Sequence, residues 1–345
     1  MVSLLWTPAS AYTTANKHSY YPDDAWYRTD EAKKVAEFVI SWQSPEGGWP
    51  KNPIDTGASM YAGEPARIRP TFDNGATSME MRYLGRLAGV TKEPKYIESY
   101  LKGLDYILEA QYDNGGWPQS HPPGEGYGRY ITFNDGAMAR VMFVLDEILK
   151  KPDQYDFVPD DQRKAVQEAW DKGIEAILKC QVKVDGKLTV WCSQHDEKDF
   201  SPTAARTFEP VALTASETIG IVHVLMAEEK PSAEVIAAVD AVYEYLVKVK
   251  LTGIRVEDKP TEGTPRGFER YVIEDPSAPP QWARFYEIGT NKPVFADRDG
   301  VVKYKLSEIG VERRTGYKWY GMWPRAFLTS EYPEWKKKVS GEARQ

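Results

Sequence analysis

Residues 43–50 read QSPEGGWP, and the phrase returns as QYDNGGWP over residues 111–118. A degraded copy runs from Gln181 to Trp191. The three leading glutamines are 68 and 70 residues apart, so each repeat is long enough for two helices and their connections. This Gly-Gly-Trp phrase therefore marks a repeating structural unit.

A second phrase follows each copy of the first. It carries adjacent Asp and Asn residues in the first two repeats and a Glu-Pro pair in the third. Because the two phrases recur together, the sequence predicts a ring of helical hairpins. The second phrase reads TFDNGA at 71–76, TFNDGA at 132–137 and TFEP at 207–210.

Apolar residues at helical spacing precede each Gly-Gly-Trp phrase and predict helices over residues 30–42, 96–110 and 160–179. The second phrase is expected to open their partner helices, since Asn and Asp cap helices and proline fits a first turn. These partners are predicted after residues 73–74, after 134–135 and over 213–226, with a further helix over 232–248.

Three segments are expected to form one catalytic domain. Residues 1–28 form an irregular N-terminal segment, and residues 29–252 carry the helical hairpins. Residues 253–345 form an irregular coil and C-terminal segment that completes the same domain, with a small β-hairpin at the Asp299-Gly300 pair. Long irregular segments in compact proteins usually carry function, so we expect the chemistry in residues 253–320.

Composition excludes some classes of function. The 345 residues carry a formal net charge of −7, which argues against a nucleic-acid partner. No apolar run approaches the ~18 residues of a membrane span, so no membrane partner is expected. Cys180 and Cys192 could form a disulfide in an oxidising compartment or remain thiols.

The repeats also predict a site. If the partner helices are parallel, their starts gather at one end of the ring and bring together polar residues from all three repeats. Carboxylates there would suit Ca²⁺, which takes roughly 6–8 oxygen ligands. The alternative is that these residues only cap helices, although a cap needs one polar residue and the first two repeats each supply two. The residues are Asp73, Asn74, Asn134, Asp135 and Glu209.

Aromatic and arginine residues invite two different interpretations. Trp49 and Trp117 are expected to be structural, because a Gly-Gly turn can tuck an indole over the end of a hairpin. The late irregular segment places arginines such as Arg270 and Arg284 among aromatic residues. Their planar forks suit carboxylate ligands, or they form salt bridges to neighbouring acids, namely Glu269, Glu274 or Glu287.

Three further motifs accompany the repeats: WCSQHD at 191–196, RTFEP at 206–210 and WARFY at 282–286. Together the motifs resemble the family 10 pectate lyases over about residues 29–320. The resemblance implies a mainly α fold, an α/α toroid or incomplete α/α barrel of helical hairpins with long irregular coils. It also implies a secreted, Ca²⁺-dependent enzyme that cleaves polygalacturonate (pectate). We expect a monomer and a mature extracellular segment without its signal peptide.

The same resemblance assigns roles to individual residues. Arg284 matches the family's proton-abstracting arginine, and Arg206 and Arg270 match arginines that hold substrate carboxylates. Asp135 looks like a calcium ligand, and Asp73 like the aspartate that supports calcium beside the scissile bond. Asn74 is expected to contact substrate.

The implied reaction is β-elimination, in which a base removes the C5 proton of a galacturonate and the C4 oxygen departs. Arginine is an unusual base, because a guanidinium keeps its proton below pH ~12. Neighbouring Ca²⁺ and arginines would disfavour its charged form, which predicts an alkaline activity optimum. Among the histidines, His195 could reach substrate from its loop.

Three other functions remain open at this stage. A toroidal glycoside hydrolase could use two carboxylates, such as Asp73 and Asp135, as acid and base. Terpenoid cyclases carry a similar Gln-x-x-x-Gly-x-Trp phrase, but Asp160-Asp161 gives poor support for their acidic motif. A non-catalytic sugar-binding module would bind polygalacturonate without shortening it.

Overall fold

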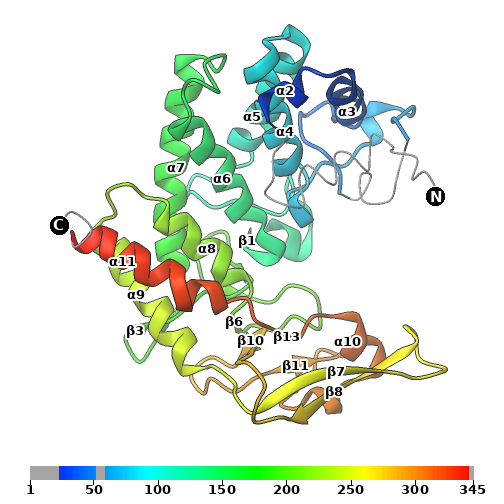
Figure 1. Cartoon of the computed structure of the whole chain (residues 1–345), viewed down its shortest axis with the longest axis vertical. Helices are drawn as coiled ribbons and strands as arrows, with labels where there is room; N and C mark the ends of the chain where they lie inside the picture. The colour runs from blue at the N-terminus through cyan, green and yellow to red at the C-terminus, as the bar shows by residue number, and fades with distance from the viewer. Residues whose placement is uncertain (1–22, 52–58, 342–345) are drawn as a thin grey trace. The chain divides into compact units, whose positions relative to one another are not determined.

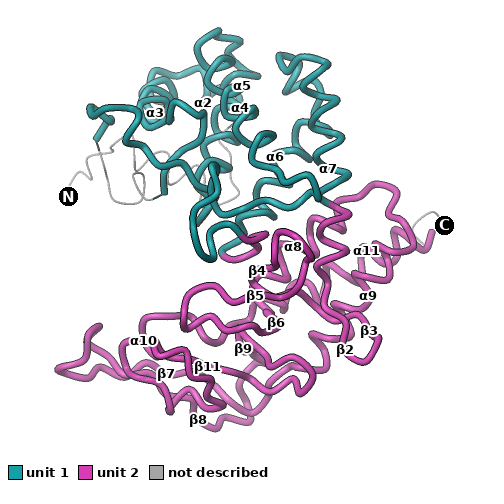
Figure 2. The backbone as a smooth tube through the Cα atoms, turned by 180° about the vertical axis from the view of Figure 1, so that it is seen from behind, with its two compact units in different colours: residues 1–129, 135–173 teal, residues 130–134, 174–345 magenta. Residues whose placement is uncertain are grey.

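The computed structural model describes residues 23–51 and 59–341. The chain divides into two compact units, drawn in teal and magenta in Figure 2. Unit 1 holds residues 1–129 and 135–173, and unit 2 holds residues 130–134 and 174–345. Within the described ranges, no helix has the length and apolar character needed to cross a membrane.

Unit 1 contains the helices of the first two repeats (Figure 1). The helices predicted over residues 30–42, 96–110 and 160–179 are confirmed to within two residues at each end. Most of the predicted irregular segment 1–28 lies outside the described residues, but residues 24–27 within it are helical. The helices are α2 (Asp24–Tyr27), α3 (Asp30–Ser41), α4 (Ser78–Thr91), α5 (Pro94–Glu109), α6 (Ala137–Lys150) and the first part of α7 (Asp160–Cys180), and the 3₁₀ turns are η1 (Pro65–Arg67), η2 (Asp73–Gly75) and η3 (Gly126–Arg129).

Unit 2 combines helices with short strands. The turn η4 (Asn134–Gly136) crosses the boundary between the units. The helices and helical turns of unit 2 are the end of α7, α8 (Glu217–Met226), α9 (Ala233–Lys248), η5 (Leu306–Glu308), α10 (Val311–Gly316), η6 (Phe327–Glu331) and α11 (Tyr332–Ser340). Its strands are β1 (Ile131–Thr132), β2 (Lys183–Val184), β3 (Lys187–Leu188), β4 (Gln194–His195), β5 (Pro202–Thr203), β6 (Leu213–Thr214), β7 (Ile254–Pro260), β8 (Phe268–Glu274), β9 (Trp282–Ala283), β10 (Phe285–Tyr286), β11 (Phe295–Ala296), β12 (Val302–Lys303) and β13 (Tyr320–Gly321).

The helices pack as hairpins, and the mainly helical fold class is confirmed. In unit 1, α4 packs against both α5 and α6, so the partner helices of the first two repeats are neighbours. In unit 2, α8 packs against α9. The buried face of α5 shows why: Tyr96, Tyr100 and Leu104 recur at helical spacing and are fully buried.

The Gly-Gly-Trp phrase has the same structural role in every repeat. The indole of Trp49 is buried and donates from Nε1 to the carbonyl of Val39 at 2.8 Å. Trp117 donates in the same way to Ile107 and Trp191 to Ile177, at 2.9 and 2.7 Å. Each phrase therefore fixes an indole against the helix before it, which confirms the structural interpretation of Trp49 and Trp117.

The leading glutamine of each phrase joins neighbouring repeats. Gln43 Nε2 donates to Gly47 within its own phrase and to Ser99 on α5, both at 2.8 Å. Gln111 repeats the pattern with Gly115 and Ala169 at 3.0 and 2.9 Å. Gln181 donates to Thr189 and Ala238 at 2.9 and 3.1 Å. A side-chain amide that satisfies two carbonyls explains why glutamine recurs at this position.

Glycine is required where the phrase approaches the next helix. Gly47 has φ +109°, and a Cβ there would lie 2.2 Å from the carbonyl oxygen of Lys102. Gly115 has φ +94°, and a Cβ would lie 2.1 Å from that of Lys172. Both positions combine a left-handed backbone with a contact that no side chain can enter.

One predicted helix is shorter than expected, and one hairpin was not predicted. The helix predicted over residues 213–226 begins only at Glu217, because Leu213 and Thr214 pair with β10 as strand β6. The hairpin predicted at Asp299-Gly300 is confirmed as β11 and β12, but the longer hairpin of β7 and β8 was missed. No residue of these two strands is fully buried. The sequence therefore lacks the alternation of apolar and polar residues by which a strand is recognised.

Candidate functional site

The two Asp/Asn pairs form 3₁₀ turns and do not cap the helices that follow. The N-cap of α4 is Thr77 and that of α6 is Gly136, and neither has a side-chain cap bond. In each turn the second residue is left-handed, with φ +54° at Asn74 and +50° at Asp135. Non-glycine residues adopt this conformation rarely and mostly as Asn or Asp, so these polar residues shape a tight turn before each helix.

The two turns differ in the position at which they carry their carboxylate. The buried first position holds Asp73 in one repeat and Asn134 in the other, and the left-handed second position holds Asn74 and Asp135. Asn74 is exposed and Asp135 is half-buried. The carboxylates therefore occupy different positions in the two turns.

Asp73 already has a cation partner in unit 1. Lys51 Nζ forms an ion pair and hydrogen bond with Asp73 Oδ2. The lysine side chain is 44% exposed, whereas that of Asp73 is 10% exposed. The lysine can therefore leave for solvent at low cost, while the carboxylate stays fixed in its turn.

Unit 1 brings Asp73 and Asp135 into one neighbourhood through Arg140 and helix α6. The turn η2 packs against α6, which begins just after Asp135. A Cβ built on Gly75 would lie 3.4 Å from Arg140 Nη1, and one on Gly136 3.2 Å from Arg140 Nε. Burial and the nearby Arg82 lower the pKa of Arg140, and Asp135 opposes this shift. Arg140, which the sequence analysis missed, places a guanidinium beside both turns.

The third repeat behaves differently. Glu209 lies in unit 2 and not with Asp73 and Asp135 in unit 1. It accepts hydrogen bonds from Arg206 at 2.7 and 2.5 Å and from the Tyr317 hydroxyl at 2.7 Å. Burial alone would raise the pKa of Glu209, but the bonds from Arg206 and Tyr317 outweigh it and lower that pKa. Glu209 is therefore an ionised anchor for Arg206.

The backbone of Arg284 is fixed from both sides. It lies between β9, which pairs with β13, and β10, which pairs with β6. Its amide donates to Trp319 at 2.7 Å, and its carbonyl accepts from Ala215 at 3.0 Å. Phe285 and Trp319 beside it belong to the buried apolar cluster of unit 2. This preorganises the residue that the sequence analysis assigned as the base.

The side chain of Arg284 is nearly buried. Its Nη2 forms an ion pair with Glu217 Oε1 and lies 3.5 Å from Asn134 Oδ1. Its guanidinium carbon lies 4.6 Å from the centroid of the Tyr317 ring. One tenth of the side chain is exposed. A carboxylate partner favours the charged form of a guanidinium. The sequence did not reveal this contact between Arg284 and Glu217.

Arg270 has an acidic partner other than the three foreseen. Its Nε and Nη2 donate to Asp258 at 2.7 and 2.8 Å across the β7–β8 hairpin. Glu269 instead binds Arg314 with two bonds of 2.8 Å, and Glu287 accepts from Thr290 and Tyr304. Arg270 thus forms a salt bridge, but with an acid 12 residues away that the hairpin places opposite it and not with the three acids considered from the sequence.

Tyr317 contacts all three arginines that the sequence analysis assigned to the site, namely Arg206, Arg270 and Arg284. Arg270 Nη1 donates to its carbonyl at 3.1 Å, and the guanidinium carbons of Arg206 and Arg284 lie 5.9 and 4.6 Å from its ring centroid. Its ring stacks on Phe285 at 6.3 Å. Burial raises the pKa of Tyr317 well above its ordinary value, so its hydroxyl stays neutral. The sequence offered no signal for this residue.

The donors fit calcium only in part. In the described part of the chain, no three His, Cys, Asp or Glu side chains cluster closely enough to hold a metal ion. Asp73 and Asp135 offer the hard oxygen donors that Ca²⁺ takes, but not the roughly 6–8 ligands that it needs. Substrate carboxylates and water would have to complete the shell.

His195 is structural and does not face solvent. It is fully buried on β4, and Cys192 N donates to its Nε2 at 3.1 Å. Because Nε2 accepts, Nδ1 carries the proton and donates to the Phe200 carbonyl at 2.8 Å. Burial lowers the pKa of His195 to about 4. This burial argues against the possibility that His195 reaches substrate from its loop.

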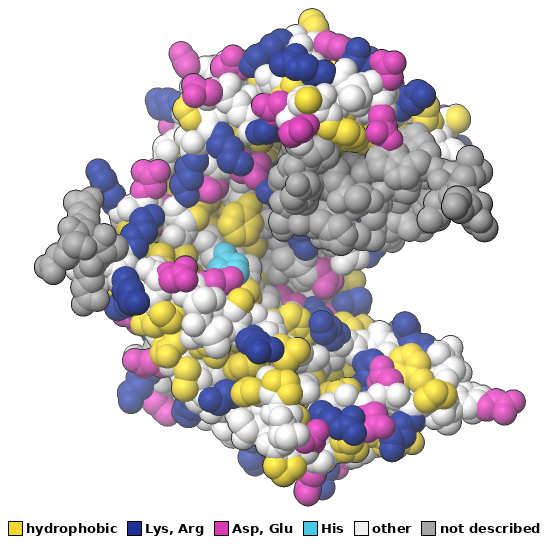
Figure 3. All heavy atoms as spheres, in the orientation of Figure 1, with side chains coloured by type: hydrophobic (Ala, Val, Ile, Leu, Met, Phe, Trp, Pro, Cys, Tyr) yellow, Lys and Arg dark blue, Asp and Glu magenta, His cyan; other side chains and the backbone are white. Residues whose placement is uncertain are grey.

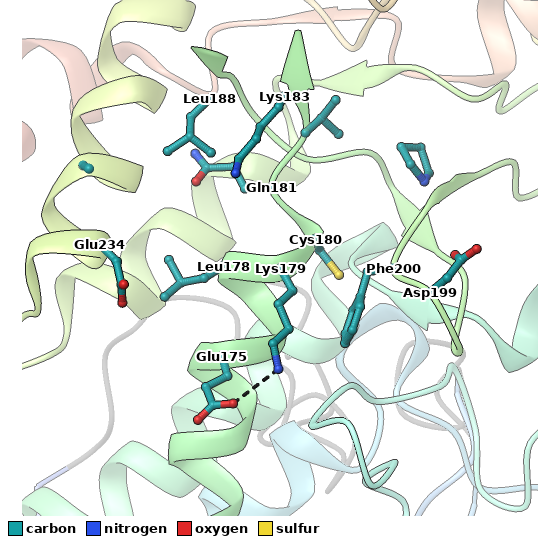
Figure 4. Close-up of a pocket in the computed structure, with 13 residues that line it drawn as sticks. Glu175, Leu178, Lys179, Cys180, Gln181, Lys183, Leu188, Asp199, Phe200 and Glu234 are labelled. Atoms are coloured by element: carbon teal, nitrogen blue, oxygen red, sulfur yellow. Dashed lines mark hydrogen bonds and ion pairs between the residues drawn. The ribbon is translucent and has the colours of Figure 1, made fainter. Parts of the chain in front are cut away.

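A separate pocket of about 950 Å³ lies in unit 2, between the end of α7, the β2–β3 hairpin and α9 (Figure 4). Phe200 lines it, with Lys179 Nζ 5.6 Å from the ring centroid. Lys179 also pairs with Glu175 at 3.3 Å, and Asp199 and Glu234 add two more carboxylates. None of the predicted site residues lines this pocket, and its three acids suit a polyanion poorly.

In the face drawn in Figure 3, basic and acidic side chains are interspersed and form no large field of one sign. Local arginine contacts therefore matter more than net charge for an anionic ligand.

Comparisons with known proteins agree on one family. A family model described as pectic acid lyase matches residues 23–328. A family 10 polysaccharide lyase from Cellvibrio cellulosa is similar at 30% identity and a TM-score of 0.80, covering 96% of this chain and 98% of that chain. An aspartate-to-alanine mutant of a family 10 lyase from the same organism, in complex with trigalacturonic acid, is also 30% identical, with a TM-score of 0.79 and coverage of 94% and 97%. The search of curated proteins found no match.

Proposed function

We propose that this chain, which belongs to the pectic acid lyase family and is a polysaccharide lyase acting on pectate, cleaves polygalacturonate by Ca²⁺-dependent β-elimination with Arg284 as the base. The observation that carries the proposal is the similarity over nearly the whole chain to a lyase in complex with trigalacturonic acid. The arginines around Tyr317 support it, because galacturonate carries a carboxylate on every sugar.

The substrate is held by its carboxylates. Arg206 and Arg270 present guanidinium groups whose partners, Glu209 and Asp258, fix their orientation. Arg206 is 39% exposed in its side chain and Arg270 18%, so each has a face that a uronate can approach. Asn74 adds an exposed amide beside Asp73. Planar forks of this kind bind carboxylates with defined geometry.

Arg284 performs the proton transfer. Its neutral guanidine accepts the C5 proton, the C5–H electrons form the C4=C5 double bond, and the C4–O bond breaks as the glycosidic oxygen leaves. Negative charge develops on the C6 carboxylate during this step, so fixed positive groups act most strongly there. The clamped backbone of Arg284 supports this role, because a base must be held in place to be efficient.

Asp73 and Asp135 would hold the ion. A calcium ion bound there supplies positive charge beside the uronate carboxylate and lowers the barrier to removal of its C5 proton. Lys51 must move aside or share Asp73, which its exposure allows.

The setting follows from the substrate. Because a pectate polymer lies outside cells, we propose that the chain is secreted. We also propose that it acts as a monomer. Neither β-elimination nor the ion pairs of unit 2 requires a second copy.

Absorbance of the product separates the alternatives. Polygalacturonate is incubated with the protein, with Ca²⁺ and with a chelator, and ultraviolet absorbance of unsaturated uronides is followed. A lyase gives rising absorbance that the chelator abolishes and added Ca²⁺ restores. Shorter chains without absorbance would mean a hydrolase, and no change in chain length would mean a binding module. Activity that survives the chelator would overturn the role of calcium.

A further inference from the structure

We propose that Glu217 is the positioning residue of Arg284: its buried carboxylate orients the guanidinium and stabilises the positive charge that Arg284 gains on accepting the substrate proton. This inference rests on the function proposed above, in which Arg284 is the base. It goes further because it gives that base a fixed partner from another segment of the chain.

One stretch of strand pairing places both members of the pair. Thr214 on β6 lies opposite Phe285 on β10, and the amide of Ala215 donates to the carbonyl of Arg284 at 3.0 Å. Two residues later, Glu217 begins helix α8. The partner of Arg284 is therefore set by backbone hydrogen bonds and does not depend on a flexible surface contact.

Each oxygen of the Glu217 carboxylate has its own donor. Thr214 Oγ1 donates to Oε2, and Arg284 Nη2 donates to Oε1. The side chain of Glu217 is 2% exposed, so water cannot easily replace either bond. Thr214 thus orients the carboxylate, and the carboxylate orients the guanidinium.

Stability alone is a weak reason for this ion pair. Desolvation of two charges usually offsets most of their attraction, so a buried pair often contributes little to the free energy of unfolding. In the Ser-His-Asp triad, a buried carboxylate instead orients the base and stabilises the cation that forms on it. Glu217 has the burial, the second hydrogen bond and the contact that this role requires.

Two other groups that contact Arg284 are uncharged. The Tyr317 ring stays neutral, and Asn134 carries no charge. The guanidinium carbon of Arg206 lies 5.9 Å from the centroid of the Tyr317 ring, and Arg206 is itself ion-paired with Glu209. Glu217 is an acid directly bonded to the Arg284 guanidinium.

Removing the charge and keeping the shape gives a directional test. In Glu217→Gln the guanidinium loses its negative partner, so the acidic limb of the pH profile of kcat moves to lower pH by about 1 unit or more. The cation formed in the transition state is also less stabilised, so kcat at the plateau falls about 10²-fold. Glu217→Asp keeps the charge and shortens the reach, so kcat falls while the limb stays near its original pH.

The experiment measures kcat from about pH 6 to pH 11 at saturating pectate and Ca²⁺. Glu312→Gln is the matched control, because the side chain of Glu312 is 46% exposed and pairs with the exposed Arg298 and the buried Arg313, and it should leave the profile unchanged. A folded Glu217→Gln variant with an unmoved limb overturns the inference, since a purely structural role would scale activity equally at all pH values. If Glu217→Gln does not fold, Glu217→Asp decides: full turnover, or a limb moved to lower pH, overturns it.

Failure of the proposed function looks different. If the wild-type protein forms no unsaturated product, or if folded Arg284→Ala keeps its turnover, the base assignment itself is wrong. If Arg284→Ala is inactive while Glu217→Gln keeps the wild-type pH profile, only the inference about Glu217 is wrong.

Discussion

Two ion pairs, one in each unit, differ in what they can give up. In unit 1, Lys51 is 44% exposed and holds an Asp73 side chain that is 10% exposed. In unit 2, Arg284 and Glu217 are 9% and 2% exposed. An exposed lysine can be exchanged for another cation, because water compensates its charge when it leaves. A buried pair cannot be opened so cheaply.

This difference suits the proposed division of work. A carboxylate with a replaceable partner can receive a metal ion, and a guanidinium with a permanent partner can act repeatedly in the same position. The comparison also implies that substitutions at the Arg284–Glu217 pair change both stability and turnover, whereas those at the Lys51–Asp73 pair change mainly ion binding.

The largest effect is expected from Arg284→Ala. Loss of the base should lower kcat about 10²–10⁴-fold, and the unpaired buried Glu217 should reduce the free energy of unfolding by about 3–5 kcal/mol. Arg284→Lys keeps the charge and should recover stability without recovering turnover. Denaturant unfolding and initial rates measure both. Near-normal turnover in a folded Arg284→Ala protein would contradict the assignment.

Acid should destabilise unit 2 through protonation of the buried His195. Its pKa is lowered from 6.5 to about 4 by burial, so the unfolded chain binds this proton more readily than the folded one. The contribution is complete above pH 6.5 and is lost as pH falls towards 4, by about 3 kcal/mol in all. Thermal unfolding from neutral to acid pH should therefore be flatter in His195→Gln, and an identical slope would refute the account.

A smaller effect is expected at Asp73. In Asp73→Asn the apparent affinity for Ca²⁺, read from activity against free ion concentration, should fall about 10–100-fold, as for other groups that support a metal. The melting temperature should change little, because the amide keeps the shape of the turn. A large loss of stability would mean that Asp73, like Glu217, is part of the buried framework.

Lys51→Met should have the smallest effect. Removing a half-exposed lysine should alter the free energy of unfolding by less than about 1 kcal/mol. Apparent Ca²⁺ affinity should rise slightly, because a competing cation is gone. Titration of activity with Ca²⁺ in parallel with Asp73→Asn tests this. A severe loss of turnover would instead place Lys51 in direct contact with substrate.

Much of the helical framework could be read from local sequence. The spacing of apolar residues located α3, α5 and α7, and the Gly-Gly-Trp phrase predicted buried indoles. The expectation that the Asp/Asn pairs at 73–74 and 134–135 cap the partner helices failed, because the chain makes a separate 3₁₀ turn before each helix begins. Asp and Asn favour left-handed turns as well as caps, so the residue types alone could not distinguish the two.

The site was less accessible to such reasoning. Arg206 meets an acid three residues away, but Arg284 meets one 67 residues away. Arg140 and Tyr317 had no motif at all, since each acts by touching several segments at once. Sequence similarity pointed to the arginines and aspartates, and it was silent on the groups that hold them.

By itself, the sequence determined the repeating helices and the turns that require glycine, because helix periodicity and backbone strain depend on residues close together in the chain. Only the tertiary structure decided which acid each arginine meets and which cations are replaceable. Those outcomes depend on strand pairing and burial between distant segments, where water is excluded and charge interactions become strong.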